Sequence, residues 1–134
     1  MSVTTAYITT DEFLRGTRAA MFQHLGVDIV QEYLENAAIV MDGYLSTPFK
    51  LPLRSWKSDI RRVNAQLATF LLKIEQCGMQ PNSKEYETLR QQYDDAMLFL
   101  KKAQVRDIRP QVEDSTPNSQ EYQLNVVTSK PSGW

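Results

Sequence analysis

Apolar residues recur every three to four positions along four stretches of this chain, which is the spacing of amphipathic helices. Gly16 lies inside the first stretch and costs a helix about 1 kcal/mol relative to alanine, so we expect the first helix to be marginal or broken. The pattern indicates an all-α fold, a four-helix bundle-like domain. The helices are expected at Thr9 to about Leu25, Ile29 to about Leu45, Ser55 to about Gln76 and Lys84 to about Gln104.

The stretch between the second and third helices has a different period. Pro48 and Pro52 lack an amide donor and favour extended conformations in the residues before them. Between and after them, Phe49, Leu51 and Leu53 alternate with polar residues or proline, a period of two. This pattern predicts an extended, proline-containing strap whose apolar edge is pinned across the helical core and fixes where the third helix begins.

Beyond residue 110 the composition changes. Val112–Ser119 is mostly small or acidic and contains a proline, which predicts a flexible linker. Tyr122, Leu124 and Val126 then follow an alternating pattern typical of a strand, with no partner strand predicted elsewhere in the chain. Such a strand pairs with something else or stays disordered, because its backbone groups need partners. We therefore divide the chain into a helical domain, 1–110, and an extended C-terminal tail, 111–134.

Charge and candidate chemistry narrow the function classes. The 134 residues carry a net charge of −1, so no general attraction to nucleic acid or to an anionic membrane is expected. The single cysteine, Cys77, cannot form an internal disulfide. His24 is the only histidine, and the sequence has no Cys and His cluster that could bind a metal. It also has no phosphate-binding loop motif and no motif that marks a nucleophilic serine. We expect no catalytic residues, no metal, no cofactor and no membrane segment, and hence no enzyme.

One segment, Lys50–Arg62, is rich in cations, with Asp59 its only acid. Arg54, Lys57 and Arg61 are spaced three and four apart, which predicts one basic face at the start of the third helix. This face either contacts phosphate or an acidic partner surface, or it is simply solvated with Asp59 in local ion pairs. The sequence leaves both alternatives open.

The segment Glu35–Leu45, with the sequence ENAAIVMDGYL, and the PFKLPL of Pro48–Leu53 together resemble the Mu-type prophage head–tail connector family. Members carry a helix ending in (I/M)-D-G-Y-L, then a short extended segment ending in L-P-L. Tyr7–Phe13 and Tyr93–Leu100 resemble the family's opening and its later helix. The chain departs from the family pattern at Thr47–Phe49, where an Arg-Tyr pair is usual. It also departs at Val105–Asp107, where the usual glycine after the last helix is missing.

The resemblance implies a structural protein of the virion neck in a tailed phage, made in the bacterial host cytoplasm. Such adaptors form a homo-oligomeric ring below the portal protein, here expected to be a dodecamer that matches the portal. The ring extends the channel through which double-stranded DNA passes, and it docks the next neck or tail-terminator protein. In related adaptors a C-terminal extension reaches toward the portal, so Tyr122, Leu124 and Val126 are expected to bind it by strand addition.

A ring also needs contacts between neighbouring subunits. We expect Phe49 and Leu51 to face a neighbour, with the alternative that both belong to the core of their own subunit. Arg54, Lys57 and Arg61 are expected to meet an acidic portal surface or an adjacent subunit. The alternative function is a small helical nucleic-acid-binding or regulatory protein that uses the basic segment 50–62. An all-helical enzyme lacks any supporting motif.

Overall fold

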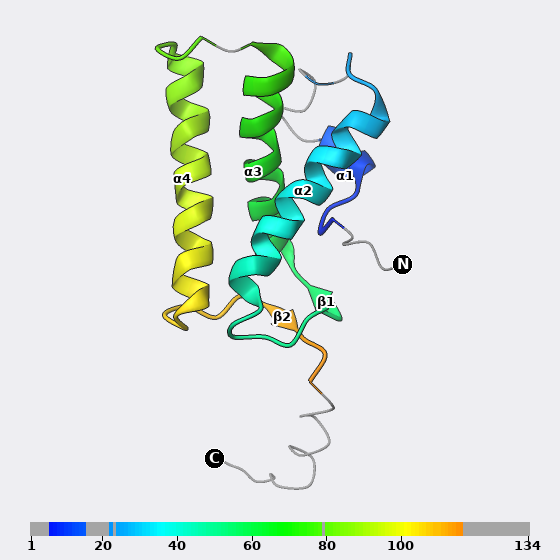
Figure 1. Cartoon of the computed structure of the whole chain (residues 1–134), viewed down its shortest axis with the longest axis vertical. Coiled ribbons are helices and arrows are strands. Elements are labelled where there is room, and N and C mark those ends of the chain that lie inside the picture. The colour runs from blue at the N-terminus through cyan, green and yellow to red at the C-terminus, as the bar shows by residue number, and fades with distance from the viewer. Residues whose placement is uncertain (1–5, 16–21, 23, 79, 117–134) are drawn as a thin grey trace, which may run out of the picture.

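The computed structural model describes residues 6–15, 22, 24–78 and 80–116, and these residues are mostly helical (Figure 1). The predicted all-α class is confirmed, with one very short antiparallel strand pair added to it. In chain order the elements are α1 (Thr10–Leu14), α2 (Val27–Leu45), β1 (Ser55–Trp56), α3 (Ser58–Cys77), α4 (Lys84–Gln104) and β2 (Val112–Glu113).

The three long helices form the bundle. α3 and α4 run antiparallel and side by side, and α2 crosses over them and packs against both (Figure 1). Each contributes one apolar stripe at helical spacing to a shared core. The fully buried members include Val30, Leu34, Met41 and Leu45 of α2, Ile60, Val63 and Leu67 of α3, and Leu89, Ala96 and Leu100 of α4.

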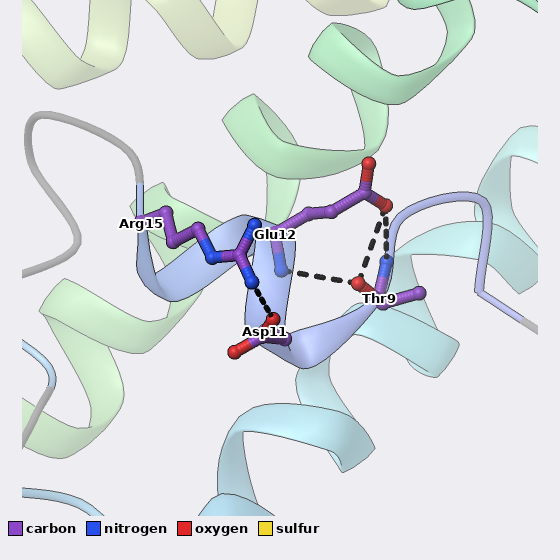
Figure 2. Close-up of polar contacts among 4 residues, drawn as sticks. All are labelled: Thr9, Asp11, Glu12 and Arg15. Atoms are coloured by element: carbon purple, nitrogen blue, oxygen red, sulfur yellow. Dashed lines mark hydrogen bonds and ion pairs between the residues drawn. The ribbon is translucent and has the colours of Figure 1, made fainter.

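The short helix α1 begins as predicted. Figure 2 shows a reciprocal capping box, in which Thr9 Oγ1 accepts from the Glu12 amide at 3.0 Å and Glu12 Oε1 accepts from the Thr9 amide at 3.3 Å. The helix ends at Leu14, and residues 24–26 are not helical, so the prediction of a helix reaching Leu25 is wrong. Five residues form too few hydrogen bonds to be stable alone, and burial of Phe13 anchors this turn to the core. Gly16 lies outside the described residues.

The other helix ends follow local chemistry closely. α3 ends at Cys77, close to the expected Gln76, and its C-cap is Gly78, whose φ of 65° is the left-handed conformation that glycine adopts without strain. The ends of α4 are also as predicted, and Ser83 caps its start by accepting from the Tyr86 amide at 3.0 Å.

The end of α4 is held by Arg106, which takes a left-handed backbone conformation that glycine usually adopts. Arg106 has a φ of 64°, and its amide and that of Asp107 donate to the Ala103 and Lys102 carbonyl oxygens at 3.0 and 2.8 Å. A non-glycine residue in this conformation costs about 1 kcal/mol. The Arg106 guanidinium donates to the Thr47 carbonyl at 3.3 Å, so this residue also ties α4 to the segment that follows α2.

Candidate interaction surface

The strap, residues 46–57, runs from the end of α2 through β1 to the start of α3 and crosses one end of the bundle (Figure 1). Phe49 and Leu53 are buried, with 7% and 6% of their surfaces exposed, and the half-buried Leu51 packs against the same core. The predicted apolar edge is therefore confirmed, and it covers the core of its own subunit. A contact of Phe49 or Leu51 with a neighbouring subunit stays a prediction.

The strap is paired along its length with the segment that follows α4. β1 and β2 are antiparallel, with Ser55 opposite Glu113 and Trp56 opposite Val112. Further backbone bonds join Lys57 to Gln111 at 3.1 Å, Arg54 to Glu113 at 2.6 Å and Ser115 to Lys50 at 2.8 Å. Pro110 and Val112 are buried. The prediction of a flexible linker is thus wrong for residues 112–116, because their backbone groups satisfy those of the strap.

Asp114 is the acidic centre of this pairing. Its carboxylate accepts from the Lys50 amide at 2.8 Å and from the Thr116 amide at 3.0 Å. The hydrogen bond from Lys50 is the largest cause that lowers the pKa of this carboxyl below its ordinary value, and the nearby Arg109 adds a smaller effect. Arg54 completes the contact, since its guanidinium donates to the carbonyl oxygens of Asp114 at 2.8 Å and Thr116 at 3.2 Å.

The predicted basic face at the start of the third helix does not form as one face. α3 begins at Ser58, so Arg54 precedes β1, Lys57 is the exposed residue at the helix start, and only Arg61 lies within the helix. Arg54 and Arg61 do line a common open hollow of about 410 Å³, with Tyr7 and Trp56. The Asp59 carboxylate, which one of the two alternatives placed in local ion pairs, accepts from the Gln111 amide at 3.0 Å.

Tyr7 joins three elements around this hollow, and the sequence did not reveal its role. Its amide donates to Asn64 Oδ1 at 2.6 Å, its carbonyl accepts from Trp56 Nε1 at 2.8 Å, and its hydroxyl donates to the Asp42 carboxylate. Asn64 Nδ2 in turn donates to the Leu34 carbonyl at 3.1 Å. Burial is the largest cause that raises the pKa of both Tyr7 and Asp42, so the phenol stays a hydrogen-bond donor at neutral pH.

A second basic group was also missed. Arg106 and Arg109 flank a hollow of about 210 Å³ with Phe49 and Ile108 in its lining, and the Arg109 guanidinium lies 5.4 Å from the centre of the Phe49 ring. These arginines follow Lys101 and Lys102 closely in the sequence, so counting cations near the end of the fourth helix would have found the group.

Several expected features fall outside this surface. Tyr122, Leu124 and Val126 lie outside the described residues. Within residues 6–15, 22, 24–78 and 80–116, no group of three or more His, Cys, Asp or Glu side chains is arranged to hold a metal ion. None of the helices in the same residues has the length and apolar character needed to cross a membrane.

The comparisons with known proteins bear on most of the chain. Searches of curated proteins and of solved structures each return no match. One family model, described as Bacteriophage Mu, Gp36, matches residues 5–128 and thus every helix and strand described above. The chain therefore belongs to the bacteriophage Mu Gp36 family and is a Mu-type phage protein.

Proposed function

We propose that this chain is the head–tail connector of its phage, a non-enzymatic adaptor. In this proposal it forms a ring below the portal, extends the DNA channel and docks the next neck or tail protein. The observation that carries the proposal is the family match over residues 5–128, which makes the chain a phage structural or morphogenesis protein. The departures from the connector pattern are compatible with that fold, since Arg106 adopts the left-handed conformation of the usual glycine.

The proposal assigns portal binding to the tail, with Tyr122, Leu124 and Val126 forming an added strand. The described part of the chain supports this assignment by fixing where the tail begins. Ser115 donates through its amide to the Lys50 carbonyl and through its hydroxyl to the Pro52 carbonyl, so the chain leaves the fold at a defined point on the strap. A tethered starting point reduces the entropy that the tail loses on docking. Lys57 and Arg61 remain proposed contacts to an acidic surface of the portal or of an adjacent subunit.

The decisive experiment is a truncation after Thr116, which removes residues 117–134 and keeps every strap contact. We expect an unchanged melting temperature and a loss of binding to the phage's portal protein. Serine at Tyr122, Leu124 and Val126 should reproduce the loss, whereas serine at Gln123 and Asn125, on the other edge of the predicted strand, should not. Unchanged portal binding by the truncated chain would overturn the assignment.

The alternative of a nucleic-acid-binding or regulatory protein makes a different prediction. It requires salt-dependent retardation of DNA, because contacts to phosphate release counterions. Arg54 is less available for such contacts, since its guanidinium is bonded to the carbonyl oxygens of Asp114 and Thr116. A mobility shift that disappears in a Lys57→Ala, Arg61→Ala and Arg62→Ala triple variant would favour this alternative over the connector.

A further inference from the structure

Among the residues that the structure describes, none packs closely enough against Gly43 to require a glycine there. Gly43 lies in the last turns of α2, it is exposed, and a Cβ built on it would meet no heavy atom within 4 Å. Glycine inside a helix destabilises it by about 0.5–1 kcal/mol relative to alanine. Glycine at such a position also lets another backbone approach closely, and here no part of the described chain does so.

The residues around Gly43 form an exposed apolar strip on the outer face of α2. Ile39 and Val40 are 54% and 44% exposed, and they precede Gly43 by four and three positions, so the three lie together on the helix surface. Toward the start of the helix the same face carries Asp28 and Glu32. Neither carboxylate forms an ion pair with any residue that the structure describes. The outer face of α2 is therefore apolar near its end and acidic near its start.

A groove of about 470 Å³ lies between α3 and α4, and no residue of α2 lines it. Its apolar lining includes Phe99, Ile108 and Leu98, and Leu98 is 51% exposed. Its rim carries Arg62 from α3 and Lys102 from α4, both exposed and both without an ion pair among residues 6–15, 22, 24–78 and 80–116. Asp95 is the one acid in the lining.

We propose that the outer face of α2 in one copy of this chain docks in the α3–α4 groove of the next copy. The two surfaces are complementary: Ile39 and Val40 face an apolar groove, and the acidic start of α2 faces Arg62 and Lys102. Gly43 lets the incoming helix lie close to the groove. Two different surfaces of one chain form the contact, so the association is heterologous, and it closes into a ring when the rotation between copies allows.

The inference deepens the proposed function, because it names the contacts between subunits of the proposed ring. It differs from the strap contact expected from the sequence, and it uses none of the tail residues assigned to the portal. The two proposals can therefore fail separately.

The test uses two variants of the full-length chain, and each variant blocks one of the two surfaces. Gly43→Tyr places a bulky side chain on the α2 face, where the monomer has open space. Leu98→Glu places a carboxylate in the apolar part of the groove, where Ile39 and Val40 of the incoming α2 would lie. Val27→Glu is the matched control, since Val27 is 60% exposed on α2 and lies outside both surfaces.

Native mass spectrometry at micromolar to millimolar protein should show cyclic oligomers for the wild type and for Val27→Glu. Each blocking variant alone should be monomeric, with self-association weakened more than tenfold. A one-to-one mixture of the two variants should give a heterodimer and nothing larger. Gly43→Tyr still offers its groove, and Leu98→Glu still offers its α2 face, so one contact remains possible.

Three outcomes would overturn the inference: a wild type that is monomeric throughout, blocking variants that assemble like the wild type, or a mixture that stays monomeric. Binding of the monomeric variants to the portal protein separates the two proposals. If the monomeric variants still bind the portal protein, both proposals are supported. If wild-type rings form but do not bind the portal protein, the connector function is contradicted, whereas the proposed contact between subunits is not.

Discussion

Among single residues, Asn64 holds the N-terminal segment in place. It is fully buried in α3, and its carboxamide bonds the Tyr7 amide on one side and the Leu34 carbonyl on the other. We predict that Asn64→Ala lowers the free energy of unfolding by about 2–3 kcal/mol, because two buried backbone groups lose their partners. Urea denaturation measures this change. Asn36→Ala, an exposed control on α2, should change it by less than about 0.5 kcal/mol; equal effects of the two substitutions would contradict the role of Asn64.

Asp114 gives the protein a specific response to acid. Its pKa in the folded chain lies below the ordinary carboxyl value, so its contribution to stability is complete at neutral pH and is lost as the pH falls through that folded pKa. We predict that Asp114→Ala destabilises the chain at pH 7 by about 1 kcal/mol, as for one partly exposed hydrogen bond. The difference from wild type should shrink below about pH 4. Denaturation at several pH values checks this, and a difference that persists in acid would contradict it.

Single residues also show where prediction from the sequence ends. Phe49 and Leu53 were placed on the strap's apolar edge by their spacing, which is a local property, and both are buried. The contacts of Tyr7 with Asp42 and Asn64 span 35 and 57 positions. No local spacing rule connects such residues, and a lone polar residue on a buried helix face was the only sign that Asn64 has a partner.

At the scale of elements, the strap covers one end of the helical core with its buried side chains. Phe49 is buried in the core at this end of the bundle, with Arg109 over its ring. We predict that Phe49→Ala lowers the free energy of unfolding by roughly 3–5 kcal/mol and that Phe49→Asp unfolds the monomer. Circular dichroism during heating measures both, with Lys50→Ala as the exposed control. If Phe49→Asp abolished assembly while the monomer kept its helicity, Phe49 would act between subunits instead.

Element boundaries were predictable where a local cap marks them. The ends of α2 at Leu45, α3 at Cys77 and α4 at Lys84 and Gln104 agree with cap and breaker residues in the sequence. The start of α3 was predicted two residues too early, because Ser55 looks like a helix cap whereas Lys57 is at the cap position. In the fold the Ser55 backbone is opposite Glu113, a residue 58 positions away, and this distant pairing overrides the local preference.

At the scale of the whole molecule, the packing of the helices could be predicted from the sequence, whereas the pairing of residues 110–116 with the strap could not. Helix periodicity predicted the packing of α2, α3 and α4, because an apolar stripe on each helix has only the other stripes to cover it. The closure by residues 110–116 was not predicted, since a two-residue strand is too short to leave a pattern. Its charges were informative in retrospect: Glu113 and Asp114 are acidic and pair with the most basic stretch of the chain.

The pairing of the strap with residues 110–116 also sets an order of folding events. Lys50 and Asp114 are 64 positions apart, whereas α3 and α4 are neighbours joined by a short turn. Contacts between distant residues close large loops and form more slowly than local ones. The helices should therefore pack first and the strap should lock last, once residues beyond α4 are in place. A subunit built this way completes its fold at the same end from which its proposed portal-binding tail departs.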